Sequence, residues 1–305
     1  MTSPSRCLFS PSRGRRLPLR ISTPPLVGEP VLTLVRTQVL RSLQRLFAPE
    51  PLALVAGDTG LFGPDSLAWR VQGDVSVFLG AIRALVVQGM HPEVVAGTME
   101  HSTFRDDPIR RLQTTSAWVT RVVYASSEDA RTAAASLAAV HHHVVGVSHR
   151  GRSYRASDPA LLSWVHNALV ESFLAAYQRF GPGLSDAEAD GYVAEMTRIG
   201  ELLGCDALPD TAALLTTWLC EHPDLGDSPG LRESLGFLSN PPLGYFYKVP
   251  YWALFHGALA SLPEPLAALA PRTLPGAGIG AETVLLGLRS ILGKSRVQEP
   301  VAQLH

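Results

Sequence analysis

Helical periodicity of apolar residues is the feature that most restricts what this sequence can fold into. Leu162, Leu169 and Phe173, for example, fall on one stripe of a 3.6-residue helix. The alternation typical of strands is almost absent, so the sequence predicts an all-α fold. The predicted helices cover residues 31–47, 74–88, 108–124, 127–145, 159–180, 186–203, 210–220, 250–262 and 281–292.

Residues typical of helix ends support these boundaries. Capping side chains stand before three of the predicted helices, at Ser126 or Ser127, at Asp158 and at Ser185. Gly89 follows the predicted helix 74–88, where it favours a stop before the chain restarts. The agreement between caps and apolar phase makes the all-α prediction consistent across levels.

The length of 305 residues and the lack of a long low-complexity linker favour one large helical domain, expected over residues 29–295. Residues 1–28 form a basic arm that is predicted to be disordered, and residues 296–305 a flexible tail. The pair Arg15-Arg16 is compatible with an export signal, but Arg20 and three prolines interrupt the apolar stretch that such a signal needs. We therefore expect a cytoplasmic protein, with secretion as the alternative.

Composition excludes several kinds of partner. The chain has 26 Lys and Arg against 27 Asp and Glu, so no global field attracts nucleic acid or an anionic membrane. No run approaches the ~20 apolar residues that a transmembrane helix needs. Hydrophobic residues make up 46% of the chain, which suits a helical core large enough to bury a ligand. Three scattered cysteines are too few for a disulfide framework and fit a reducing compartment.

Two histidines fall on apolar stripes. His141 shares a helical face with Ala130 and Ala134, and His166 shares one with Leu162. A buried neutral imidazole needs a hydrogen-bond donor or a metal for its acceptor nitrogen. The alternative is a histidine that only packs in the core, or a set of partial positive charges on the last turn of a helix.

Arg111 and Thr115 are four residues apart, so their guanidinium and hydroxyl groups point the same way from one helix. Such a pair can bind a propionate or polarise a bound oxygen species. An exposed arginine in a first helical turn is an equally good interpretation.

Other catalytic motifs are missing. The sequence has no H-E-x-x-H, no Walker loop and no C-x-x-C-H. Gly276, Gly278 and Ala281 fit G-x-G-x-x-A, but the prolines before them leave no strand, so a loop into the last helix is predicted instead of a dinucleotide site.

Six short motifs occur in a fixed order. They are Gln88-x-x-His91-Pro92, His101-Ser102-x-Phe104, Arg111-Leu112-x-x-Thr115, His141-x-x-Val144-x-Gly146, Tyr154-x-Ala156-x-Asp158-Pro159 and Trp164-Val165-His166. In this order and spacing they resemble the MpaB and rubber-oxygenase family, which includes the latex clearing proteins. The resemblance extends over roughly residues 69–218.

The resemblance implies a globin-like helical core that binds heme b without a covalent link. It implies that His141 is the iron ligand, with His166 as the alternative, and that Arg111 and Thr115 line the heme pocket with catalytic roles. The latex clearing branch has a lysine where this chain has Thr114, so a rubber-type sixth ligand is not expected. The catalytic glutamate of that branch corresponds to no aligned position; Glu93 and Glu100 are candidates.

The expected function is therefore a heme b-dependent oxygenase that acts on an apolar small molecule in specialised metabolism, with dioxygen or peroxide as oxidant. Two alternatives are a heme-binding or gas-sensing protein without turnover, and a helical protein whose histidines serve only packing.

Overall fold

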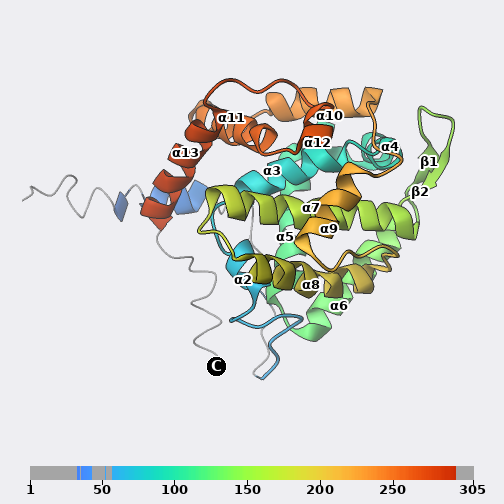
Figure 1. The fold of residues 1–305 in the computed structure, drawn as a ribbon, viewed down its shortest axis with the longest axis horizontal. Helices are drawn as coiled ribbons and strands as arrows, with labels where there is room; N and C mark the ends of the chain where they lie inside the picture. The colour runs from blue at the N-terminus through green and yellow to red at the C-terminus, as the bar shows by residue number, and fades with distance from the viewer. Residues whose placement is uncertain (1–32, 35, 43–51, 53–56, 293–305) are drawn as a thin grey trace, which may run out of the picture.

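The computed structural model describes residues 33–34, 36–42, 52 and 57–292, and within them the fold is a bundle of helices with one short β-hairpin (Figure 1). Residues 33–34 and 36–42 are helical. The labelled helices are α2 (Leu67–Gln72), α3 (Val77–Gln88), α4 (Pro92–His101), the 3₁₀ turn η1 (Thr103–Arg105), α5 (Pro108–Tyr124), α6 (Ser127–His141), α7 (Pro159–Phe180), α8 (Asp186–Leu203), α9 (Ala212–Cys220), α10 (Pro229–Ser239), α11 (Tyr245–Ala260), α12 (Glu264–Ala267) and α13 (Ala277–Leu292). The strands are β1 (Val145–Val147) and β2 (Ser153–Arg155), paired antiparallel with Gly146 opposite Tyr154.

Helix α7 lies in the centre of the molecule, between α3 and α8 (Figure 1). One of its faces, with Trp164 and Phe180, belongs to a hydrophobic cluster shared with α3, α10, α11 and α13. Another face, with Phe173 and Tyr177, belongs to a second cluster shared with α2, α5 and α8. Because both sides of α7 are covered, most of its residues from Ser163 to Phe180 are buried, and these include polar ones such as Glu171 and Ser172.

Helices α3 and α7 approach each other closely. A Cβ added to Gly80 would stand 2.7 Å from Cδ1 of Phe173, so only glycine permits this crossing. Arg83 and Glu171 form a buried bidentate ion pair across the same interface, and Arg83 also donates to the Ser172 hydroxyl at 2.8 Å. The two charges compensate each other in a buried site, where Nε of Arg83 is the one guanidinium nitrogen without a hydrogen bond.

The all-α prediction is confirmed, and α5, α7 and α8 have the predicted bounds. The Ser126 hydroxyl accepts from the Asp129 amide, and Ser185 and Glu188 form a capping box. Asp158 precedes α7 but makes no side-chain cap. Gly276, with φ at 78°, leads into α13 as the loop prediction expected.

Several helix boundaries differ from the prediction, including the end of α6 and the start of α11. Helix α6 ends at His141, four residues earlier than expected, because Val145 enters β1 and pairs with Arg155. Helix α11 begins at Tyr245 and contains Pro250 in its interior. The apolar stripe does not mark either boundary, since strand pairing and tertiary packing decide both.

The predicted arm, residues 1–28, and tail, residues 296–305, lie outside the described residues. Among the helices that the structure does describe, none combines the length and the apolar character needed to cross a membrane.

Candidate functional site

Helices α5 and α6 follow each other through a short turn and run antiparallel, so the start of α5 and the end of α6 lie at the same end of the pair. Their other end is tied down. The Trp118 indole donates to the Ala133 carbonyl at 3.1 Å, and Arg121 forms an ion pair with Asp129. Arg111 lies about two turns before Trp118, and His141 lies about two turns after Ala133. Both are therefore at the opposite end of the helix pair, which we call the open end.

This open end is only partly packed. The buried residues of α5 are its last three, 122–124, and those of α6 lie in its first half, at Ala130, Ala133 and Ala134. Toward Arg111 and His141, side chains such as Leu112 and Leu137 are half-buried. A helix pair that is packed at one end and half-covered at the other leaves apolar surface for a ligand.

Arg111 is the charged group of this open end. Its guanidinium donates to the Thr115 hydroxyl at 2.5 Å and to the Ser102 hydroxyl at 3.2 Å. The side chain keeps accessible surface, yet burial by neighbouring atoms lowers its pKa, which is the behaviour of a cation in a recess. No carboxylate in the described part of the chain offsets this charge. Arg111 is therefore free to pair with an anionic group of a ligand.

His141 lies within the electrostatic reach of Arg111. Burial lowers the pKa of His141, and the positive charge of Arg111 lowers it further, so the imidazole is neutral near pH 7. Its Nδ1 atom is buried and has no hydrogen-bond partner. The neighbouring His142 and His143 are exposed. Of the three consecutive histidines, only His141 offers a partly buried ring with a nitrogen left for a ligand.

His166 occupies different surroundings. It is buried, and burial lowers its pKa to about 4, so it too is neutral. Its Nε2 atom lies 3.1 Å from the position that a Cβ on Gly200 would take, which places the ring against α8. The two histidines thus have different neighbours: His141 lies beside Arg111, whereas His166 packs on α8.

The two glutamate candidates also separate. Glu100 accepts a hydrogen bond from the Tyr154 hydroxyl at 2.6 Å. It lies two residues before Ser102, whose hydroxyl accepts a hydrogen bond from Arg111. Glu93 is buried elsewhere and accepts from the Ser148 hydroxyl at 2.8 Å. Of the two, Glu100 is the one on the turn that approaches Arg111. Thr114 faces outward and donates to the Arg110 carbonyl at 2.9 Å.

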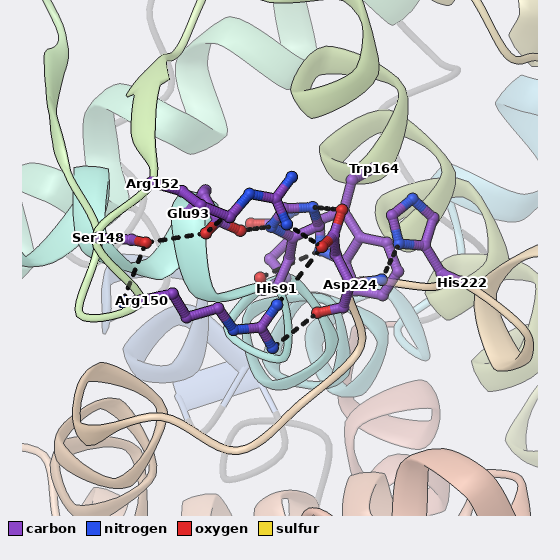
Figure 2. A network of polar contacts seen from close by, with 9 residues as sticks. His91, Glu93, Ser148, Arg150, Arg152, Trp164, His222 and Asp224 are labelled. Atoms are coloured by element: carbon purple, nitrogen blue, oxygen red, sulfur yellow. Dashed lines mark hydrogen bonds and ion pairs between the residues drawn. The ribbon is translucent and has the colours of Figure 1, made fainter.

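A second polar cluster joins the first and last of the six motifs (Figure 2). The Trp164 indole donates to the Gln88 carbonyl at 3.1 Å, and its ring centroid lies 5.5 Å from that of His91. His222 and Asp224, from the loop after α9, complete the cluster. Sequence reasoning missed both residues, because neither belongs to a motif and they lie more than a hundred residues from His91.

The catalytic-domain profile described as "ER-bound oxygenase mpaB/B'/Rubber oxygenase, catalytic domain" matches residues 69–280 of the chain. The chain belongs to the MpaB and rubber-oxygenase family. The match covers all six motifs of the family resemblance and most of the helices, so the family's oxygenase catalytic domain is the domain described here. No curated protein and no solved structure matches the chain. The globin-like core and the heme-pocket roles of His141, His166, Arg111 and Thr115 therefore stay predictions.

Proposed function

We propose that this MpaB-family protein is a heme b-dependent oxygenase that acts on an apolar small molecule. The observation that carries the proposal is the pairing at the open end of α5 and α6: a neutral His141 with an unpartnered buried nitrogen lies beside an Arg111 that has no carboxylate partner. Heme b carries both complementary groups, an iron that binds imidazole and propionates that bind guanidinium.

The donor set fits this cofactor. His141 would hold the iron, and Arg111, fixed by Thr115 and Ser102, would hold a propionate or stabilise negative charge on an oxygen species. Bound heme supplies the oxygen activation that side chains alone cannot provide. The protein's own contribution is to ligate, to orient and to exclude water, which the half-buried apolar side chains of α5 and α6 would do once covered.

The substrate proposed is a small apolar molecule. Thr114 takes the place of the lysine of the latex clearing branch, and its hydroxyl is bound to its own helix at the surface. No amine of this position is therefore available as a sixth ligand, and cleavage of long polyisoprene is not expected. Dioxygen or peroxide would be the oxidant.

The test is heme titration of the purified protein, followed by its visible absorption band. His141→Ala should abolish stoichiometric binding, because the neutral imidazole that would hold the iron is replaced by a methyl group. His142→Ala and His143→Ala are matched controls on exposed neighbours and should bind like the wild type. Loss of heme in His166→Ala with binding retained in His141→Ala would contradict the assignment.

Oxygen consumption then separates an oxygenase from a heme-binding sensor. The heme-loaded protein with a reductant should consume dioxygen in a manner that depends on an added apolar substrate, and Arg111→Ala should reduce the rate. Arg110→Ala, on the exposed neighbouring position, is the control. Heme binding without substrate-dependent consumption across a broad substrate panel would favour the sensor.

A further inference from the structure

The polar cluster of Figure 2 brings together three metal-ligating side chains from segments far apart in sequence. One ligand atom each of His91, His222 and Asp224 lies within 4.8 Å of the other two. His91 is the residue before α4, and its extended backbone is the conformation that the following Pro92 favours. His222 and Asp224 come from the loop after α9, which the Gly226 amide anchors by donating to the Met90 carbonyl at 3.0 Å.

His91 is oriented as a metal-binding histidine is. Its Nδ1 atom lies 3.4 Å from Oε2 of Glu93, and its Nε2 atom faces Oδ2 of Asp224 at 4.0 Å. A proton on Nδ1, beside the Glu93 carboxylate, would leave the lone pair on Nε2, the nitrogen that faces Asp224. Glu93 is itself held by the Ser148 hydroxyl. Both Nδ1 of His91 and Oε2 of Glu93 are buried atoms without a hydrogen bond that meets normal geometry.

The two oxygens of Asp224 have different surroundings. Oδ1 faces Arg150 and Arg152, whereas Oδ2 faces His91 across a gap too long for a direct hydrogen bond. Two ligands that each lie about 2.0–2.2 Å from a zinc ion are separated by no more than roughly 4 Å. The gap between Nε2 and Oδ2 is at that limit, so a small contraction would let both reach one ion.

His222 lies on the third side. Its Nδ1 atom accepts the Asp224 amide at 3.3 Å, a long hydrogen bond that a metal would compete with at low cost. The ring packs edge-on against Trp164 and Trp218, each with centroids 4.9 Å away. These indoles limit the access of water and hold the ring near the other two ligands.

We propose that His91, His222 and Asp224 form a Zn²⁺ site, with water in the fourth position. Two imidazoles and one carboxylate are a ligand set that this ion prefers. The ion would join the start of α4 to the loop after α9. His141 is not among these three ligands, so the zinc site extends the proposed function without depending on it.

The positive charges beside the site give the proposal its sharpest test. Glu93 and Asp224 are already balanced by Arg150 and Arg152, so an added divalent cation competes with an arginine. The Arg152 side chain is 55% exposed and can swing into solvent. Arg152→Ala should therefore tighten Zn²⁺ binding severalfold. A polar junction without a metal role predicts no such gain.

The experiment is equilibrium dialysis of the full chain against Zn²⁺, together with the visible spectrum of the Co²⁺ form. The wild type and His149→Ala, an exposed histidine on the hairpin, should each bind one ion. His222→Ala and Asp224→Asn should weaken binding by more than the roughly 10- to 100-fold that loss of an outer hydrogen-bond partner costs. Circular dichroism would check that each variant is folded.

Three outcomes would overturn the proposal. The first is a wild type that binds no Zn²⁺. The second is a Zn²⁺ affinity of His222→Ala and Asp224→Asn that equals that of the wild type. The third is an Arg152→Ala variant whose Zn²⁺ affinity is unchanged or weaker. Heme binding is measured in the same samples. Because His222→Ala should leave the heme band intact, failure of the zinc site and failure of the heme assignment can be told apart.

Discussion

At Gly146 the backbone of β1 passes so close to two side chains that no larger residue fits. A Cβ there would stand 2.4 Å from Oε2 of Glu100 and 2.5 Å from the Tyr154 hydroxyl. These two groups are hydrogen-bonded to each other above the glycine, next to the turn that carries Ser102. The last glycine of the H-x-x-V-x-G motif therefore has a packing reason: it gives room to the Glu100 and Tyr154 pair.

Gly146→Ala should destabilise the protein by about 1–3 kcal/mol, because the added methyl must displace a hydrogen-bonded pair. Gly236→Ala is the matched control. Gly236 lies inside α10 with nothing within 4 Å of an added Cβ, so alanine there should stabilise by roughly 0.5–1 kcal/mol through helix propensity. Urea denaturation measures both changes. Equal stability of the two variants would show that the hairpin yields at no cost.

Single residues differ in how far the sequence reveals their roles. The spacing of Arg111 and Thr115 fixes a shared helical face, and the direct contact between them confirms it. The inward phase of His141 was predictable because it needs only the period of α6. The zinc-site candidates His222 and Asp224 were not, since a loop has no period and their meeting with His91 depends on tertiary packing. Glu93 and Glu100 could be separated only by the structure.

Among the helices, α3 and α7 depend on the buried pair of Arg83 and Glu171. Both side chains are nearly inaccessible, with exposed fractions of 1% and 6%. Such a pair contributes little relative to apolar residues, but either partner alone is an uncompensated buried charge. Its effect therefore shows mainly when one side is removed.

Glu171→Gln should lower the free energy of unfolding by about 3–5 kcal/mol. The double variant Arg83→Met with Glu171→Met should recover much of this loss. Arg70→Ala serves as control, since Arg70 pairs with Glu188 between α2 and α8 at the surface, and should cost no more than about 1 kcal/mol. Chemical denaturation of the wild type, Arg83→Met, Glu171→Met and the double variant gives a double-mutant cycle that measures the coupling between the two side chains. If the destabilisation of the double variant equals the sum of the two single variants, Arg83 and Glu171 are not coupled and the prediction is wrong.

Whole helices were predictable where local signals suffice. Proline at the first position and the apolar phase set the starts of α5 and α7, and a capping box sets that of α8. Helix α11 was missed at its start because Pro250 is typical of a first turn. In the structure the helix already begins one turn before Pro250, with the exposed Tyr245 and Phe246. Pro250 has no N–H, so the helix lacks one backbone hydrogen bond at this position. Helix α10 was not predicted, although Ser228 caps it before Pro229.

At the scale of the whole molecule, stability should depend on pH through buried neutral histidines. His166 has an ordinary pKa of 6.5 when unfolded and a pKa lowered to about 4 by burial when folded. Between these values the unfolded chain binds more protons than the native one, so stability rises with pH. The stability gained by burying a neutral His166 is fully present above pH 6.5 and is lost as the pH falls toward 4.

Over that pH range, protonation of His166 in the unfolded chain should lower the free energy of unfolding by about 3 kcal/mol. This follows from 1.36 kcal/mol for each pKa unit between the two states. His166→Leu should make the free energy of unfolding fall less steeply between pH 7 and 4, whatever its effect at pH 8, because other histidines whose pKa burial lowers remain. His142→Leu, at an exposed position, should keep the wild-type slope. An unchanged slope in His166→Leu would mean that the ring is protonated in the fold.

The central position of α7 has a consequence for how the chain comes apart. One face of α7 belongs to each of the two hydrophobic clusters. If one cluster loses its packing, the other loses part of the support that holds α7 in place. Partial opening on one side exposes a helix that the other side needs. Heating should thus produce one calorimetric transition, in which the amide protons of α3 and α8 lose their protection from exchange together, although the two helices lie on opposite sides of α7.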